Sequence, residues 1–94
     1  MSGRIIYTQS YLKRAVKFMQ RHPELLPSYE KTLSLLELNP SHPSLRLHRL
    51  KGPLQDLYSI SINLRYRITL EFLIENDKIV LVNIGSHEEI YRQD

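Results

Sequence analysis

HPSLRLHRLKGPLQDLYSISINLRYRITLEFLIENDKIVLVNIGSHEEIY, residues 42–91 of a 94-residue chain, is the stretch that decides the fold. Apolar and polar residues alternate along 58–63 (YSISIN) and again along 66–72 (YRITLEF). A period of two is the pattern of a strand with one buried face. Residues 79–84 (IVLVNI) read instead as a central strand, apolar on both faces and covered on both sides. These three runs predict neighbouring strands of one sheet.

Short turn signals separate the runs and indicate antiparallel strands. Asn63–Leu64–Arg65 predicts a tight hairpin connection, and Asn76–Asp77 predicts a second turn, because Asn and Asp tolerate left-handed backbone. Residues 45–48 (LRLH) also alternate, which predicts a further strand ahead of the Gly52–Pro53 turn. This half of the chain therefore predicts three or four antiparallel strands.

The first half predicts one strand followed by two helices. Arg4–Thr8 (RIIYT) is short and β-branched, which fits a first strand. Two apolar stripes with helical spacing follow it: Leu12, Ala15, Val16 and Met19, then Leu26, Tyr29, Leu33 and Leu36. The Asn39–Pro40 pair ends the second helix. The expected fold is α+β: an N-terminal strand, a two-helix hairpin, then a three- to four-stranded antiparallel sheet with the helices packed on one face.

Composition limits the classes of protein that fit the chain. Ninety-four residues predict a single domain over 1–94, since two cores do not fit in that length. Cysteine is absent, which leaves no disulfide, no thiolate nucleophile and no Cys-based zinc site. No apolar run approaches the roughly 18 residues of a membrane-spanning helix. The first ten residues, MSGRIIYTQS, lack the hydrophobic core of a signal peptide, so a cytoplasmic location is expected.

Positive charge is concentrated in the second half of the chain. The net charge is +3, yet the segment from Ser44 to Arg67 alone carries +4, from five basic residues and one acid, Asp56. The five basic residues are Arg46, Arg49, Lys51, Arg65 and Arg67. A locally basic segment in a nearly neutral chain indicates an anionic partner such as RNA, DNA or an acidic peptide. A solvated charged face is the alternative.

Strand alternation predicts a polar surface that could carry chemistry. Two sets of residues share one face of a hairpin: Ser59, Ser61 and Asn63 on its first strand, and Arg67, Thr69 and Glu71 on its second. With the helices on the apolar face, this polar face is expected to be open to a ligand. Four further residues are expected around it: Arg49 and Lys51 at its edge, and His87 and Tyr91 just past the last strand.

Those groups suit the cleavage of an RNA phosphodiester by its own 2′-hydroxyl. An imidazole, with an ordinary pKa of about 6.5, can remove or donate a proton at neutral pH. Arginine can stabilise the negative charge that builds at phosphorus. The sequence has no Asp/Glu cluster for magnesium and no paired His spacing for zinc, so neither a metal nor a cofactor is expected. A structural histidine and a Tyr91 that packs on the sheet are the alternatives.

Three motifs in this order resemble the RelE/ParE superfamily of bacterial toxin–antitoxin proteins, most closely its RelE/StbE and YafQ-like branch. They are HPSLRLHRLKG (42–52), the Tyr-Arg-Ile (66–68) of RYRITLEF, and IGSHEEIY (84–91). The resemblance covers essentially the whole chain and implies the same α+β fold. It also implies a toxin that enters the ribosomal A site and cuts mRNA there without a metal. A cognate antitoxin that wraps the toxin in a hetero-oligomer is the expected partner.

The resemblance carries functional roles over to individual residues. The catalytic candidates are Arg67, which is expected to hold the scissile phosphate, His87, expected to act as acid or base, and Tyr91, expected to orient the nucleotide or help proton transfer. The candidates for binding RNA phosphate are Lys51 and His48, which match family positions, Arg65, which is close to Arg67 in sequence, and Arg49, which is expected at the sheet edge.

The chain departs from the family on the strand YSISI. RelE has two catalytic lysines on this strand, where this chain has Ser59 and Ser61, which supply no positive charge. Two alternative functions therefore stay open. One is a ParE-like toxin that binds DNA gyrase and performs no chemistry, and the other is a catalytically weak relative that keeps only the antitoxin interface.

Overall fold

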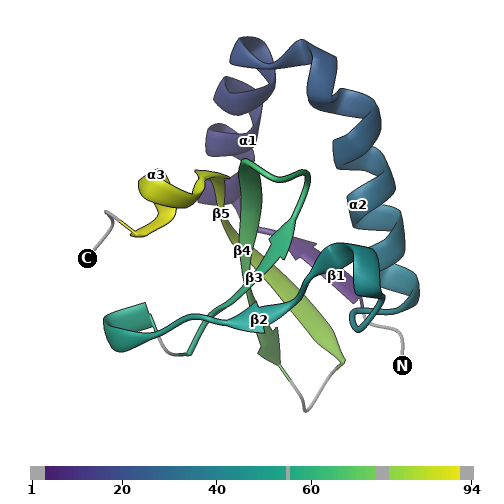
Figure 1. Cartoon of the computed structure of the whole chain (residues 1–94), viewed down its shortest axis with the longest axis vertical. Coiled ribbons are helices and arrows are strands. Elements are labelled where there is room, and N and C mark those ends of the chain that lie inside the picture. The colour runs from purple at the N-terminus through teal and green to yellow at the C-terminus, as the bar shows by residue number, and fades with distance from the viewer. Residues whose placement is uncertain (1–3, 55, 74–76, 92–94) are drawn as a thin grey trace.

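The sheet has five strands in the order β1-β5-β4-β3-β2 (Figure 1). The structure, a computed structural model, describes residues 4–54, 56–73 and 77–91. Four strands pair antiparallel along the chain: β2 (His48–Arg49), β3 (Tyr58–Ser61), β4 (Tyr66–Leu73) and β5 (Lys78–Ser86). The first strand, β1 (Arg4–Tyr7), runs parallel to β5 at the other edge. The predicted α+β class is confirmed, and β5 lies inside the sheet as its two apolar faces indicate.

Two helices follow β1, as predicted. α1 (Gln9–Arg21) is preceded by its N-cap residue Thr8, whose Oγ1 accepts the Tyr11 N–H at 3.2 Å. The short 3₁₀ turn η1 (Pro23–Leu25) joins it to α2 (Leu26–Leu38), which ends just before the Asn39–Pro40 pair. Figure 1 shows the two helices joined at their far end and separating toward the sheet. Within the described residues, no helix has the length and apolar character needed to cross a bilayer.

The core lies between these helices and one face of the sheet. The strand register pairs Ile60 with Ile68 and Ile68 with Ile84, and all three side chains are buried. Helix residues complete the core cluster: Tyr11, Ala15 and Phe18 from α1, and Leu36 from α2. Because side chains alternate along β4, the neighbours of Ile68, Arg67 and Thr69, point to the opposite face.

The buried face of α1 differs from the predicted one. Tyr11, Ala15 and Phe18 face the sheet, whereas Leu12 and Val16 are 44% and 56% exposed. Both sets have helical spacing, so the helix carries two overlapping apolar stripes. The stripe that faces the core is the one with two aromatic side chains, Tyr11 and Phe18, which are large apolar groups. The other stripe is left on the surface beside α2, where the predicted stripe residue Leu26 is also exposed.

The segment ahead of β2 is not the predicted strand. Pro43–Leu45 forms the 3₁₀ turn η2, and Arg46 follows with a left-handed φ of 50°. Pro43 has a fixed φ and no N–H for a ladder, and the Nδ1 of His42 accepts the Ser44 N–H at 3.2 Å. A left-handed residue cannot continue an extended strand. β2 therefore begins only at His48 and is two residues long.

The predicted turns are confirmed where the structure describes them. The Asn63 Oδ1 accepts the N–H groups of Arg65 and Tyr66 at 2.9 and 2.8 Å, which closes the β3–β4 hairpin. Asp77 has the left-handed φ, 49°, that its turn requires, and its partner Asn76 lies outside the described residues. Gly52 begins the 3₁₀ turn η3 (Gly52–Leu54) with a φ of 68°.

Candidate functional site

The predicted polar face exists, but most of it is covered. Ser59 on β3 pairs with Thr69 on β4, and Thr69 pairs with Asn83 on β5, so the three form one row across the sheet. Their exposed fractions are 0%, 2% and 6%, and Ser61 in the next row is 7% exposed. The expectation of a fully open polar face is therefore wrong. The small size of these side chains allows other segments to approach the sheet closely.

Part of the cover is α3 (His87–Tyr91), a short helix that the strand pattern does not predict. Gly85 pairs directly with Arg67, so both face the same side of the sheet. A Cβ at Gly85 would lie only 3.4 Å from the Cβ of Glu89, which places α3 over that face. Ile90 and Leu50 are each 2% exposed and neither belongs to the core cluster under α1 and α2. We attribute the covering of the polar face to these two segments.

A reciprocal pair of hydrogen bonds fixes α3 to the end of β5. The Ser86 N–H donates to the Glu89 Oε1 at 3.0 Å, and the Glu89 N–H donates to the Ser86 Oγ at 3.2 Å. This is a capping box, and its signal, S-x-x-E, is visible in the sequence SHEE. The hydrogen bond from the Ser86 N–H lowers the pKa of the Glu89 carboxyl. His87 is thereby held as the first residue of the helix.

Acidification is expected to weaken this anchor. Because the folded pKa of Glu89 is lowered, its contribution to stability is present above the ordinary value of 4.5 and is lost as the pH falls through the lower folded pKa. Glu89→Ala should cost about 0.2–1 kcal/mol of unfolding free energy at pH 7, since the group is exposed and screened, and less at pH 3. Glu89→Gln keeps an acceptor and should show a loss that does not vary with pH. Urea unfolding at both pH values measures this, and a Glu89→Ala protein identical to the wild type at pH 7 would contradict it.

Arg67 is half-buried on the polar face. Within the described residues it has no acidic ion-pair partner. Its Nη1 donates to the Ser61 Oγ at 3.1 Å. The ion pairs found among the described residues, His22–Glu24 and Arg49–Asp56, do not involve it. A guanidinium with a neutral partner retains both its charge and its other N–H donors. Arg67 is therefore suited to bind an anion such as a phosphate.

His87 lies at the same end of the β4–β5 ladder as Arg67. Gly85 pairs with Arg67 and Ser86 pairs with Tyr66, and His87 is the next residue along the chain. Its side chain is exposed. Tyr91 ends α3, and its side chain lies outside what the structure describes, so its role stays a prediction.

His48 is on the same face, at the edge strand. It pairs with Ser59, and its exposed ring has Nδ1 3.1 Å from the Arg46 carbonyl oxygen. A carbonyl only accepts, so Nδ1 carries a hydrogen and Nε2 has the free lone pair of the neutral ring. β2 and β4 are two strand spacings apart, about 10 Å. His48 lies in the row of Ser59 and Thr69 and Arg67 lies in the next row, so the two residues share this face without being cross-strand partners.

The other basic candidates do not all lie on this face, and the expectation that Arg49 is at its edge is wrong. Lys51 is exposed just past β2, and the Arg65 guanidinium lies 5.5 Å from the centre of the Tyr66 ring. Arg49 is the neighbour of His48 on β2, so strand alternation directs it to the opposite face, and its Nη2 is 3.9 Å from the Asp56 Oδ1. The strand register thus puts His48 and Arg67 on one face of the sheet and Arg49 on the other, and His87 follows directly after the end of β5. The binding role predicted for each stays a prediction.

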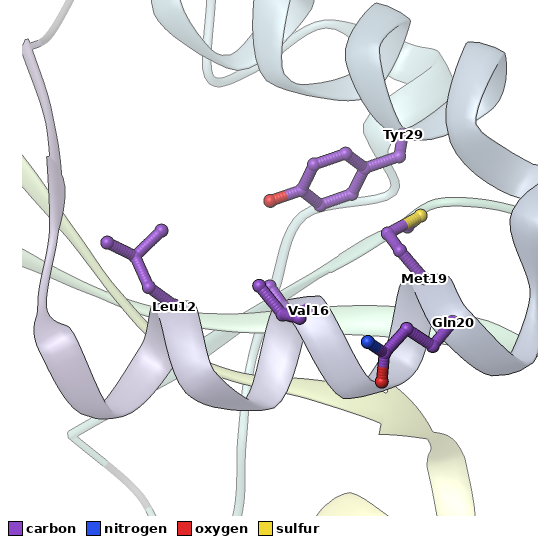
Figure 2. A pocket seen from close by; sticks show the side chains of 6 residues that line it. Leu12, Val16, Met19, Gln20 and Tyr29 are labelled. Carbon is purple, nitrogen blue, oxygen red and sulfur yellow. The ribbon is translucent and has the colours of Figure 1, made fainter.

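A second surface is the apolar groove between α1 and α2. Figure 2 shows Leu12, Val16 and Met19 of α1 on one side, with Tyr29 of α2 pointing toward them. These residues line a hollow of about 400 Å³. The Tyr29 hydroxyl is 2.8 Å from the Tyr11 hydroxyl, and burial raises the pKa of both, so both stay protonated at neutral pH.

The rim of the groove is basic. A neighbouring hollow of about 450 Å³ shares Leu12, Val16 and Gln20 with the first and adds Lys13 and Lys17. No acidic residue occurs in α1, so the helix offers no intrahelical ion-pair partner to either lysine. The groove therefore has an apolar floor and a positively charged edge. The helical spacing of Leu12 and Val16 predicts that both lie in the core, so this surface is not predicted from the sequence.

No protein-family model matches the sequence, and no curated protein matches it. Among solved structures, YafQ from Escherichia coli superposes with a TM-score of 0.76 at 14% identity, covering 95% of this chain and 98% of that chain. The E. coli DinJ–YafQ toxin-antitoxin complex matches with a TM-score of 0.75 at 16% identity, over 97% and 99% of the two chains. The YoeB–YefM complex from Staphylococcus aureus matches with a TM-score of 0.69 at 17% identity, over 93% and 99%. These likenesses show that the chain has the fold of the RelE/ParE-type toxins, as the sequence resemblance implies.

Proposed function

We propose that this chain, which has the RelE/ParE-type toxin fold, is the toxin of a type II toxin–antitoxin system and cuts mRNA on the ribosome. The observation that carries the proposal is Arg67, a half-buried guanidinium with a neutral hydrogen-bond partner on a face that also bears His48. His87 follows directly after β5, at the end of the sheet where Gly85 pairs with Arg67. A cation and two imidazoles are the groups needed for phosphodiester cleavage by an internal 2′-hydroxyl.

In the proposed reaction, the 2′-oxygen attacks phosphorus and the bond from phosphorus to the 5′-oxygen breaks. One imidazole takes the proton from the 2′-hydroxyl, and the other gives a proton to the departing 5′-oxygen. Nε2 of His48 has the free lone pair that a base requires, which leaves the acid role to His87. Arg67 stabilises the negative charge on the phosphate oxygens. The products are a 2′,3′-cyclic phosphate and a 5′-hydroxyl, and no metal takes part.

The serines that replace the lysines of RelE fit this arrangement. Ser59 is fully buried, so a lysine there would have to bury an ammonium group or displace the segment that covers it. Ser61 holds Arg67 instead of supplying charge itself. The positive charge for RNA binding then comes from Arg67 together with the exposed Lys51 and Arg65.

To test the proposal, purified protein is added to a translating extract, and the positions of breaks in a reporter mRNA are mapped. Wild-type protein should cut, and His87→Ala should cut at least about tenfold more slowly because one proton transfer loses its catalyst. Glu88→Ala, a change to the exposed neighbour of His87, is the matched control and should cut normally. An uncut reporter with all three proteins would rule the nuclease out.

One observation favours a non-enzymatic alternative, a ParE-like inhibitor of DNA gyrase. The sheet face carries serines at the positions of RelE's lysines, and most of it is covered. Induced expression separates the two functions, since a gyrase inhibitor should produce filamentation with DNA damage. An mRNA nuclease should arrest translation at once.

We also propose that the apolar groove between α1 and α2 receives a segment of the cognate antitoxin. An amphipathic segment with apolar residues flanked by acids would match the floor of Leu12 and Val16 and the edge of Lys13 and Lys17. Its expected source is the protein encoded by the neighbouring reading frame.

Val16→Asp is expected to weaken antitoxin binding by at least about tenfold, because it places a carboxylate in the apolar floor. Val16 is 56% exposed, so the free protein should stay folded. Leu64→Asp, at an 84% exposed apolar residue in the β3–β4 turn, is the matched control. Calorimetric titration with the neighbouring protein measures both affinities, and equal losses in the two variants would count against the groove.

A further inference from the structure

The environment of Arg67 indicates what orients it. Ser61 and Arg67 are direct partners across β3 and β4, and the Arg67 Nη1 donates to the Ser61 Oγ at 3.1 Å. On the other side, the partner of Arg67 is Gly85, which has no side chain. Ser61 is thus the cross-strand neighbour that can hold the guanidinium.

We infer that Ser61 is a positioning residue that orients the guanidinium of Arg67 toward the phosphate of bound RNA; this inference rests on the proposed nuclease function. Ser61 is short and only 7% exposed, so its hydroxyl has a nearly fixed location. The long side chain of Arg67 has many rotamers, and a fixed acceptor selects among them. A guanidinium that is already oriented loses less freedom when the phosphate binds.

The type of acceptor also suits this role. A serine hydroxyl is neutral, so it leaves the positive charge of Arg67 intact, whereas a carboxylate would neutralise it. The bond occupies Nη1 and leaves the edge formed by Nε and Nη2 for two parallel hydrogen bonds to phosphate oxygens. A lysine at this position would instead repel the guanidinium. Ser61 therefore allows the face to bind phosphate through one oriented arginine.

Ser59 provides a matched comparison within the same strand. It is the same residue type, two positions away on the same face, and fully buried. Its Oγ has no hydrogen-bond partner within the described residues. Loss of the Ser59 hydroxyl removes a buried polar group without touching Arg67, whereas loss of the Ser61 hydroxyl releases the guanidinium.

The test compares Ser61→Ala, Ser61→Thr and Ser59→Ala in the full chain. In the translating extract, Ser61→Ala should lower the cleavage rate about tenfold, and Ser61→Thr, which restores a hydroxyl, should recover most of it. Ser59→Ala should cut like the wild type. If the wild type cuts and Ser61→Ala cuts equally fast, the inference is overturned.

A second measurement is independent of nuclease activity. NMR of the Arg67 guanidinium should show slow rotation about its Nε–Cζ bond in the wild type and in Ser59→Ala, and faster rotation in Ser61→Ala. If the wild type does not cut RNA at all, the proposed function fails, and this measurement still decides the positioning role. Equal rotation rates in all of the proteins would overturn the role, whether or not RNA is cut.

Discussion

Replacing Arg67 by glutamine is expected to lower the rate of mRNA cleavage by at least about 100-fold. Arg67 is half-buried on the polar face, and its direct cross-strand partners are Ser61 and Gly85. Charge that develops on the phosphate is stabilised most by a donor that is already in place and partly shielded from water. Arg67→Lys should recover only a small part of the rate, because an ammonium cannot make two parallel hydrogen bonds to phosphate.

The matched control is Arg4→Gln, which removes the same charge from an exposed residue of the edge strand β1. It should cut within about threefold of the wild type, which separates the local role of Arg67 from a general effect of net charge. Single-turnover cleavage of a reporter mRNA in a translating extract measures all three variants. Arg67→Gln activity close to that of Arg4→Gln would show that the proposed site is misplaced.

Ile68→Ala is expected to lower the free energy of unfolding by about 2–5 kcal/mol. Ile68 is fully buried between Ile60 and Ile84 in the strand register, so truncation leaves a cavity in the middle of the core. A domain of this size has a total stability of only about 5–14 kcal/mol. The midpoint of thermal unfolding should fall by about 10 °C or more.

Two control variants define the scale of that loss. Ile68→Val removes one methylene and should cost only about 0.5–1.5 kcal/mol. Leu64→Ala, at a residue that is 84% exposed, should stay within about 0.5 kcal/mol of the wild type. Chemical denaturation measures the three proteins. If the Ile68→Ala protein were as stable as the Ile68→Val protein, the packing described for Ile60, Ile68 and Ile84 would be contradicted.

The alternating half of the sequence determines most of the fold. The runs around Ser59 and Ile68 have a strict period of two, so the strands, their hairpin and their buried faces follow from the pattern alone. The parallel pairing of β1 with β5 does not follow, because the period within a strand contains no information on its neighbour. In α1, two apolar stripes share Ala15, and only the tertiary fold decides which one is buried.

The candidate site is predicted in part. Arg67 and His87 come from the motifs, and the register places them at one end of the β4–β5 ladder. The covering of the polar face does not follow from alternation, since it depends on the segment of Leu50 and on α3, a helix of five residues. The S-x-x-E signal at Ser86 and Glu89 was the available clue to that helix. The bond from Arg67 to Ser61 depends on cross-strand register, which the sequence fixes only once the hairpin turn is known.

The central claim is that this face cuts RNA through the RNA's own 2′-hydroxyl. The most direct measurement is the chemistry of the ends that wild-type protein leaves on a reporter mRNA in a translating extract. The proposal predicts a 5′-hydroxyl on one fragment and a 2′,3′-cyclic phosphate on the other, with both absent from the Arg67→Gln reaction. Fragments with 5′-phosphate ends, or an intact mRNA in the presence of folded wild-type protein, would contradict it.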